Sequence, residues 1–218
     1  MPDPRLGRIG TSVEGRPIES FVRRSLRTET NIIFGGFHGN EPKSVYVARR
    51  LIELLAADST TGSNLAWVVV PMVNPDGCFR RKRRNANGVD INRNFPTENW
   101  ERGSPRSRMF GGEFPASEPE TRTVVKLVER VRPSRIIAIH SIDRGRECNN
   151  YDGPGRALAE AMSRVNGYPV KNSIGYPTPG SFGTWAGVER GIPTITLELP
   201  SRHSPQRCWG DNMMSLLR

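Results

Sequence analysis

The chain alternates between short, continuous apolar runs and longer stretches in which apolar residues recur every three or four positions. The four apolar runs have the length of buried strands and span residues 31–37, 66–73, 135–140 and 193–199. The helical spacing covers residues 42–57, 117–133, 155–165 and 208–217. A short helix is expected around Trp185 and Val188, and an edge strand at residues 19–24. Strands that alternate with helices predict a layered α/β fold, and nothing in the composition of residues 1–218 suggests a second domain.

Polar residues follow several of the predicted strands at the point where each one ends. His38 follows the first strand, Asn74 follows the second, and His140 closes the third. In open α/β sheets, binding sites form beyond the carboxyl ends of the strands. We therefore expect these side chains to meet at one edge of the sheet. The segment 78–114 has no clear periodicity, and structureless segments of this length in a compact domain are usually functional.

His38, Glu41 and His140 form a candidate metal site. A histidine and a carboxylate three residues apart, on a turn from strand to helix, can both reach one zinc ion. The His-x-x-Glu spacing alone is equally compatible with a surface histidine beside a capped helix. Two of the three histidines in the chain end predicted strands, however, and three protein ligands are what a catalytic zinc requires. The third histidine, His203, lies in a polar segment and is expected at the surface.

Glu198 is a carboxylate within the otherwise apolar fourth strand. Burial raises the pKa of a carboxyl group, which suits a general base that acts near neutral pH. The alternative is a carboxylate at the end of a strand, paired with one of the many arginines. The local sequence does not choose between these interpretations.

The formal net charge of +10 is compatible with an anionic partner such as a nucleic acid, an acidic polymer or a carboxylate-bearing substrate. The basic cluster at residues 80–84 is expected to be a solvated loop, and it lacks the interleaved aromatic residues that would stack on bases, so nucleic acid is not favoured. The polar amino terminus, the absence of a long apolar run and three widely spaced cysteines predict a cytoplasmic protein without an export signal or a membrane span.

Five short motifs occur in the chain in a fixed order. They are His38-Gly-Asn-Glu41, Asn74-Pro-Asp-Gly77, Gly88-Val-Asp-Ile-Asn-Arg-Asn-Phe-Pro96, His140-Ser141 and Thr196-Leu-Glu-Leu199. Together they resemble the zinc carboxypeptidases of the carboxypeptidase A superfamily over roughly residues 16–200. The segment from Tyr176 to Trp185 is most similar to the bacterial murein peptide amidase branch of that family. The resemblance implies a three-layer α/β/α domain with a mixed, mostly parallel sheet and one zinc ion per chain.

The resemblance also implies roles for residues near the metal. His38, Glu41 and His140 match the family's zinc ligands, and Glu198 matches its general base. Asp90 matches the carboxylate that orients the first zinc histidine.

Four further residues match groups that contact the substrate. Asn92 and Arg93 match the pair that holds the terminal carboxylate of the substrate, and Tyr176 matches the tyrosine that closes over it. Arg83 matches the arginine that stabilises the oxyanion, although the neighbouring arginines allow a register shift of one residue.

By this resemblance, the chain is expected to hydrolyse an amide bond to a C-terminal residue with a free carboxylate. The expected substrate is a small murein peptide, cleaved between γ-D-glutamate and meso-diaminopimelate. The alternatives are an aspartoacylase-like or desuccinylase-like N-acyl amino acid hydrolase, a general carboxypeptidase, and a non-catalytic module that binds an anionic polymer. Position 40 is an asparagine, where aspartate is commoner in the murein peptide amidase branch, and this favours the acylase alternative. Gly183 implies an open pocket for the substrate side chain, in which we expect an arginine or an acid.

Overall fold

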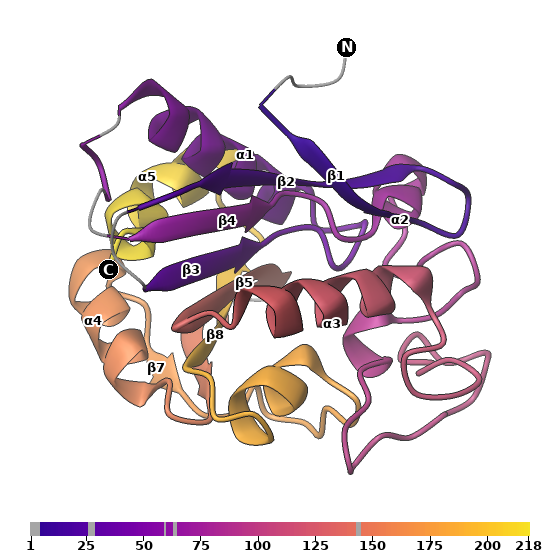
Figure 1. Cartoon of the computed structure of the whole chain (residues 1–218). Coiled ribbons are helices and arrows are strands. Elements are labelled where there is room, and N and C mark those ends of the chain that lie inside the picture. Colours follow the sequence, from indigo (N-terminus) through magenta and orange to yellow (C-terminus); the bar gives the residue numbers. More distant parts are fainter. Residues whose placement is uncertain (1–4, 26–28, 59, 63–64, 143–144) are drawn as a thin grey trace.

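The computed structural model describes residues 5–25, 29–58, 60–62, 65–142 and 145–218. Eight strands form one sheet in the order β1-β2-β4-β3-β5-β8-β6-β7 (Figure 1). The strands are β1 (Gly7–Thr11), β2 (Pro17–Arg23), β3 (Thr30–Phe34), β4 (Ala66–Val70), β5 (Arg135–Ile142), β6 (Cys148–Asp152), β7 (Val170–Lys171) and β8 (Thr194–Pro200).

The centre of the sheet is parallel and its flanks are mixed. Strands β4, β3, β5 and β8 pair in parallel, whereas β1, β2 and β6 join their neighbours β2, β4 and β8 in antiparallel fashion. The central strands are buried on both faces, which explains their continuous apolar sequences. The expected α/β fold with a mixed, mostly parallel sheet is confirmed.

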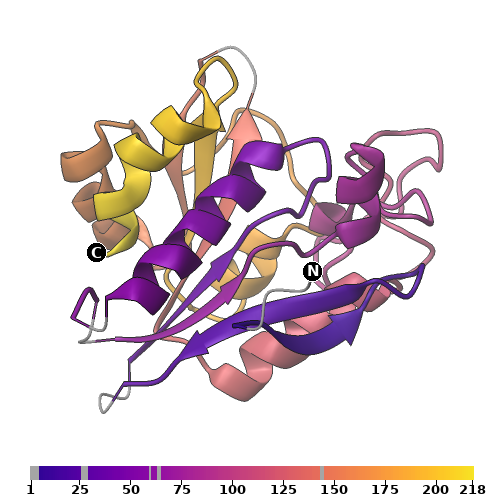
Figure 2. The same cartoon turned by 90° about the horizontal axis from the view of Figure 1, so that it is seen from above.

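Helices cover both faces of the sheet (Figures 1 and 2). Helices α1 (Pro42–Ala57), α4 (Arg156–Asn166) and α5 (Pro205–Leu216) pack on one another over one face, and α3 (Pro119–Val131) covers the other with the short π-helical turn η2 (Thr184–Val188). Alternate residues of a strand enter opposite cores, so Ile33 packs with the α1 side and Ile32 with the α3 side. The result is a three-layer arrangement.

The predicted strand at residues 19–24 exists as β2, but it is not an edge strand. It lies between β1 and β4, because β1 adds a hairpin strand outside it. The polar sequence Gly-Arg-Ile-Gly-Thr of β1 gave no apolar signal from which a strand could be predicted. Strand β3 also ends at Phe34, three residues before the end of its apolar run.

Two short helices overlap or lie within the segment 78–114, which was expected to lack structure. These are α2 (Pro75–Arg80) and the 3-10 turn η1 (Ile91–Arg93). Backbone hydrogen bonds such as Asp90 N to Phe110 O and Phe95 N to Gly180 O hold the remainder in place. None of the helices in the described ranges combines the length and the apolar character that a membrane span requires.

Candidate active site

His38 and Glu41 lie on the connection from β3 to α1. Glu41 occupies the position just before α1, whose first residue is Pro42, as expected from the sequence. His38 and Glu41 are only 3% and 7% exposed, so the interpretation of His38 as a surface histidine is wrong. The connection is compact because Gly39 packs against Gly77, where a Cβ at position 39 would lie only 1.9 Å from the Gly77 carbonyl carbon.

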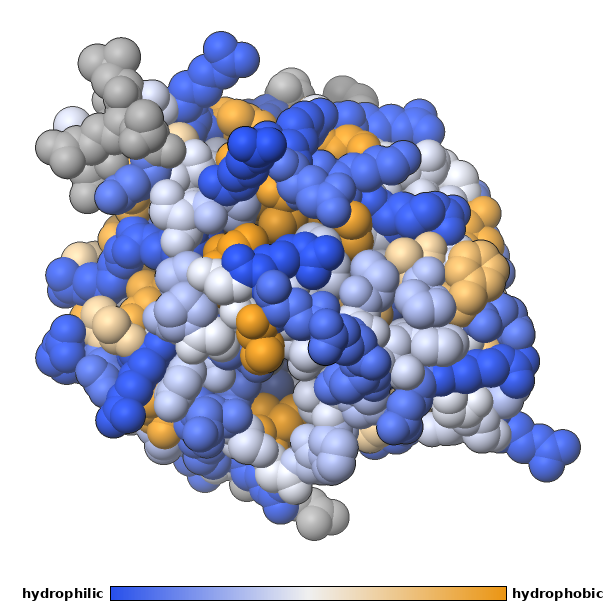
Figure 3. Space-filling model, turned by 60° about the horizontal axis from the view of Figure 1, so that its bottom comes forward, coloured by the Kyte–Doolittle hydropathy of each residue, from blue (hydrophilic) through white to orange (hydrophobic). Residues whose placement is uncertain are grey.

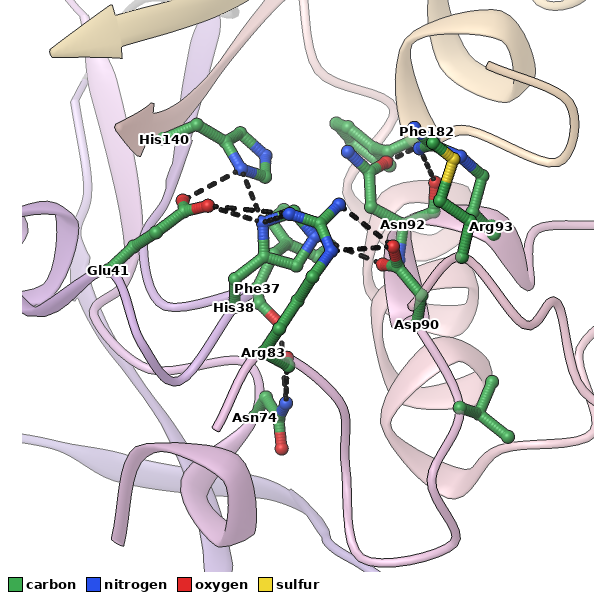
Figure 4. A network of polar contacts seen from close by, with 12 residues as sticks. Phe37, His38, Glu41, Asn74, Arg83, Asp90, Asn92, Arg93, His140 and Phe182 are labelled. Carbon is green, nitrogen blue, oxygen red and sulfur yellow. Dashed lines mark hydrogen bonds and ion pairs between the residues drawn. The ribbon is translucent and has the colours of Figure 1, made fainter. Parts of the chain in front are cut away.

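His140, on β5, converges with these two residues from the neighbouring strand (Figure 4). The Nδ1 atoms of His38 and His140 are 3.2 Å apart. The carboxylate of Glu41 bridges them, with Oε1 2.7 Å from Nδ1 of His38 and Oε2 3.2 Å from Nδ1 of His140. His203 lies elsewhere, 3.2 Å from Asp211.

The donor set of this cluster fits a zinc ion. Its three residues are buried, and their ligand atoms all lie within 4.8 Å of one another. Tetrahedral zinc with bonds of about 2.0 to 2.1 Å places neighbouring ligand atoms about 3.3 Å apart, close to the separations observed here. Two imidazoles and one carboxylate are also a typical protein set for a catalytic zinc with an open position. Burial opposes ionisation of Glu41, but the neighbouring histidines hold its pKa below the usual range, so it remains a carboxylate.

Asp90 connects the candidate ligand His38 to Arg83. Its Oδ1 lies 3.0 Å from Nε2 of His38, and its Oδ2 accepts from Nε of Arg83 at 2.9 Å (Figure 4). Asp90 is fully buried, yet the charges of Arg83 and His38 keep its pKa well below the usual range. A partner on Nε2 leaves Nδ1 of His38 directed at the cluster, which is the common arrangement for a metal-bound histidine.

Arg83 is the arginine of the basic cluster that enters the site. Its Nη1 lies 3.3 Å from Nδ1 of His38 and 3.7 Å from the carboxylate of Glu41. The next residue, Arg84, turns away and donates to the backbone carbonyls of Pro105 and Ser107. The expectation of a solvated loop is therefore wrong for Arg83, because its charge is paired with Asp90 inside the protein.

Asn74 fixes the two loops that carry His38 and Arg83. Its Nδ2 donates to the carbonyls of Phe37 and Arg83, each at 3.3 Å, while its Oδ1 caps α2 by accepting from Gly77 N at 2.8 Å. Asn74 lies at the carboxyl edge of the sheet, as the sequence predicted. Its hydrogen bonds hold the backbone at Phe37 and Arg83 in place beside the candidate metal cluster.

Asn92 and Arg93 lie on η1, directly after Asp90. Asn92 Oδ1 accepts from Phe182 N at 2.8 Å, which leaves the amide Nδ2 free to donate (Figure 4). Arg93 is only 3% exposed, its Nε has no partner in the described structure, and burial lowers its pKa. No carboxylate of the described residues forms an ion pair with Arg93: Asp90 is near enough to raise the pKa of its guanidinium, but Asp90 is itself paired with Arg83.

Tyr176 lies at the mouth of the same cavity, where its side chain is 41% exposed. It is close enough to the guanidinium groups of Arg83 and Arg93 to contribute to their pKa values. The structure thus brings Tyr176 together with the other residues expected to contact substrate.

Glu198 projects from β8, at the position paired with His140 across β5 and β8. It is 6% exposed, and burial together with the charge of Glu41 raises its pKa to about 8. Among the described residues, no arginine or other donor pairs with its carboxylate. This excludes the alternative in which Glu198 is neutralised by an arginine, and it leaves a titratable carboxyl group that faces the cavity.

The three candidate zinc ligands line one cavity of about 540 Å³ together with Arg83, Asn92, Arg93, Tyr176 and Glu198, whereas Asn74 and Asp90 lie behind its wall. Two further polar residues in its wall, Asn150 and Asp152 on β6, were not predicted as site residues. The sequence of β6, Cys-Asn-Asn-Tyr-Asp, is polar and gave no apolar signal for a strand, although β6 pairs with β8. The pocket beside Gly183 was expected to hold an arginine or an acid, and it holds the acid Asp152.

The zinc carboxypeptidase family model matches residues 2–151 of the chain. The murein peptide amidase A of Escherichia coli K12 is 35% identical over 208 residues, which cover 90% of this chain and 82% of that protein. The murein peptide amidase A of Vibrio campbellii is 32% identical over 203 residues, covering 88% and 77% of the two chains. The crystal structure of murein-tripeptide amidase from Escherichia coli O157 superimposes with a TM-score of 0.80 at 29% identity and covers 99% of this chain and 91% of that one.

These matches agree with the cluster of two histidines and a glutamate, which supplies a suitable set of zinc ligands. The chain therefore belongs to the zinc carboxypeptidase family and is a zinc-dependent hydrolase.

Proposed function

We propose that the protein hydrolyses the amide bond between γ-D-glutamate and meso-diaminopimelate in murein peptides, as an exopeptidase that requires a free terminal carboxylate. The observation that carries this proposal is the buried guanidinium of Arg93, which forms no ion pair with any described carboxylate and lies beside the free amide of Asn92 in the cavity of the metal cluster. A buried charge without a partner is costly, so a carboxylate ligand is the natural complement.

In this proposal, Arg93 and Asn92 hold the terminal carboxylate of the substrate. The guanidinium forms charge-assisted hydrogen bonds with it, and Nδ2 of Asn92 adds a further donor. The bond from Phe182 N to Oδ1 of Asn92 fixes the orientation of the amide in advance. Tyr176 closes over the bound peptide from the mouth of the cavity.

His38, Glu41 and His140 would hold the zinc, which when bound acts as a Lewis acid that polarises the scissile carbonyl and acidifies water. Glu198 accepts the proton of the attacking water and later delivers it to the leaving amine. Arg83, held by Asp90, donates to the oxygen on which negative charge develops.

The choice of murein peptides rests on the 35% identity to murein peptide amidase A over most of both chains. A cytoplasmic site of action, on free peptides, is also part of the proposal. Its support is that Cys78, Cys148 and Cys208 are all free, as expected in a reducing compartment.

The test compares the murein tripeptide with the same peptide whose terminal carboxylate is converted to a carboxamide. We expect the carboxamide to lower kcat/KM by about 100-fold, because it leaves Arg93 buried and unpaired. Arg93→Ala should cause a similar loss with the free acid. Arg84→Ala, a change in the arginine that turns away from the site, is the matched control and should alter the rate less than threefold. Equal rates for the acid and the carboxamide would refute the proposal.

The same assay separates the alternative functions. Turnover of N-acetylaspartate or N-succinyl amino acids without turnover of peptides would identify an acylase. Asn40, which lies in the cavity wall, favours this alternative. Equal turnover of ordinary α-linked peptides would identify a general carboxypeptidase. Salt-sensitive binding of an anionic polymer without metal-dependent turnover would identify a binding module.

A further inference from the structure

The basic cluster at residues 80–84 lies beside a second basic segment, residues 102–108. Neither segment contains an acid. Arg84 joins them, because its guanidinium donates to the backbone carbonyls of Pro105 and Ser107 at 3.0 and 3.1 Å. Figure 2 shows α2 and the loops that follow it gathered at one end of the molecule, away from α4 and α5. We call residues 79–84 and 102–108 the basic end.

Most of the positive charge of the basic end is unpaired. Three of its eight cations have a carboxylate partner: Arg80 pairs with Glu14, Arg83 with Asp90 and Arg102 with Glu113. Among the described residues, the other five form no ion pair, and these are Arg81, Lys82, Arg84, Arg106 and Arg108. Glu101, just before the second segment, offsets at most one of their charges. A dense group of unpaired cations attracts an anionic surface.

Phe79 adds an apolar group to the basic end. It is 74% exposed, the largest exposed fraction among the large hydrophobic residues that the structure describes. It lies in the last turn of α2, directly before the basic cluster, and the guanidinium of Arg16 lies 4.5 Å from the centroid of its ring. Single exposed apolar residues are common on protein surfaces. This one, however, adjoins a group of unpaired cations.

The combination of many cations with one exposed ring distinguishes between anionic partners. A single-stranded nucleic acid stacks its bases on several aromatic rings, and Phe79 is the one aromatic residue of the basic end. An acidic polymer attracts cations but has no apolar interior that could receive a ring. A membrane with anionic lipids offers both, since its headgroups attract Lys and Arg while its interface buries aromatic side chains.

We infer that the basic end binds reversibly to the surface of membranes that contain anionic lipids, with Phe79 inserted at the level of the headgroups. Each Lys or Arg close to such a surface strengthens binding about fivefold, and an apolar group combined with a basic patch holds a protein better than either one alone. This surface lies outside the metal cluster, so the inference does not depend on which substrate the cavity binds.

The test measures co-sedimentation of the zinc-loaded enzyme with vesicles of phosphatidylcholine, pure or with about one lipid in three replaced by phosphatidylglycerol. We expect binding to the mixed vesicles to be at least about 50-fold tighter than to the pure ones, and to weaken as the salt concentration rises. The triple variant Arg81→Gln, Lys82→Gln and Arg106→Gln should bind the mixed vesicles about 100-fold more weakly. Arg108 is left unchanged because it lines the cavity.

A second triple variant controls for net charge. Lys126→Gln, Arg130→Gln and Arg164→Gln remove the same charge from exposed positions on α3 and α4. Since these positions lie outside the basic end, we expect binding to weaken by less than about threefold.

A single substitution tests the role of the aromatic ring. Phe79→Ser should weaken binding to the mixed vesicles about 10-fold, because the ring no longer leaves water on binding. Met214→Ser, at a residue that is 50% exposed on α5, is the matched control and should change binding less than about twofold.

Equal binding to both kinds of vesicle, equal losses in the two triple variants, or unchanged binding by Phe79→Ser would each overturn the inference. Tighter binding to single-stranded DNA than to the mixed vesicles would also overturn it and would identify a nucleic-acid surface. The comparison of vesicles uses the unmodified enzyme and so does not depend on whether a variant folds. Vesicle binding requires no turnover, so a failure of the proposed function would appear in the tripeptide assay alone.

Discussion

At the scale of single residues, Asp90 determines the direction of two groups of the site. Its two oxygens hold Nε2 of His38 and the guanidinium of Arg83, so one carboxylate orients both a candidate metal ligand and the candidate oxyanion donor. This double contact is absent from any local sequence pattern, since His38 and Arg83 are 52 and 7 positions away from Asp90.

Asp90→Asn should therefore weaken zinc binding. The amide is uncharged and cannot accept from both partners with two oxygens, so we expect the dissociation constant for zinc, measured by competition with a chelator, to rise by about 10- to 100-fold. Asp211→Asn removes a carboxylate near the distant His203 and should change zinc affinity less than twofold. Unchanged affinity in Asp90→Asn would contradict the orienting role.

Asp152 should reduce the stability of the ligand-free protein at neutral pH. Its pKa is raised by burial to about 6, above the ordinary aspartate value, so its favourable contribution is complete at low pH and is lost as the pH rises through about 6. In Asp152→Asn, the gain in the free energy of unfolding relative to the unmodified protein should be larger at pH 7.5 than at pH 4.5. We expect a difference of roughly 1 to 2 kcal/mol after allowance for solvent screening.

Urea unfolding of both proteins at the two pH values measures this difference, since the loss of metal at low pH affects both alike. A gain that is equal at the two pH values would show that the carboxylate is not destabilised by burial.

At the scale of elements, the turn that leads from Arg83 to Asp90 is organised by Asn85. Its Oδ1 accepts from the backbone N–H groups of Asn87 and Val89, and its Nδ2 donates to Glu118 at 2.7 Å and to Glu120 at 3.0 Å. These two glutamates lie at the start of α3, so Asn85 links the turn between Arg83 and Asp90 to a helix on one face of the sheet.

Asn85→Ala should both destabilise the protein and impair the site. It removes one donor from each of two buried carboxylates and leaves two backbone N–H groups without partners. For this we expect a loss of about 2 to 4 kcal/mol in the free energy of unfolding. Asn87→Ala removes one exposed donor to Glu118 and is the matched control, with an expected loss below about 1 kcal/mol. Equal losses in the two variants, measured by denaturant unfolding, would contradict this account.

The sequence predicted those elements whose apolar pattern is strong. The central strands and helices α1, α3, α4 and α5 follow it closely, because both faces of the sheet are buried and each helix needs an apolar stripe. Strands β1 and β6 could not be found in this way, since their polar sequences are stabilised by pairing with β2 and β8. Asp152 was missed for the same reason, because it becomes a cavity residue only when β6 pairs with β8.

The candidate site was predicted more completely than its supports. The motifs placed the metal cluster, Glu198, Asn92, Arg93 and Tyr176 in one region, and all of them line one cavity. The resemblance also predicted that Asp90 contacts His38, but the second contact of Asp90, with Arg83, came only from the structure. Arg83 is distinguished from Arg84 only by the direction of its side chain, towards Asp90 and not towards Pro105.

At the scale of the whole molecule, the excess of positive charge extends into the cavity. Hydrophilic side chains cover much of the face shown in Figure 3, with apolar residues scattered among them. The cavity itself is lined by four arginines, Arg83, Arg93, Arg108 and Arg146, against three acids, Glu41, Asp152 and Glu198. Such a cavity suits a substrate with more carboxylates than amines, and the murein tripeptide has three carboxylates and two amines. The net charge of +10 therefore agrees with a small anionic peptide as the substrate.

In the proposed mechanism, Glu198 is the general base in the zinc-dependent release of diaminopimelate from the murein tripeptide. The most direct test measures this release by mass spectrometry for the zinc-loaded enzyme, for the chelated enzyme, and for Glu198→Gln with its zinc content determined. We expect metal-dependent release by the unmodified enzyme, and a loss of at least about 1,000-fold in Glu198→Gln at one zinc per chain. Glu160→Gln, on the exposed face of α4, should retain the rate within twofold. Undiminished release by Glu198→Gln, or by the chelated enzyme, would contradict the account.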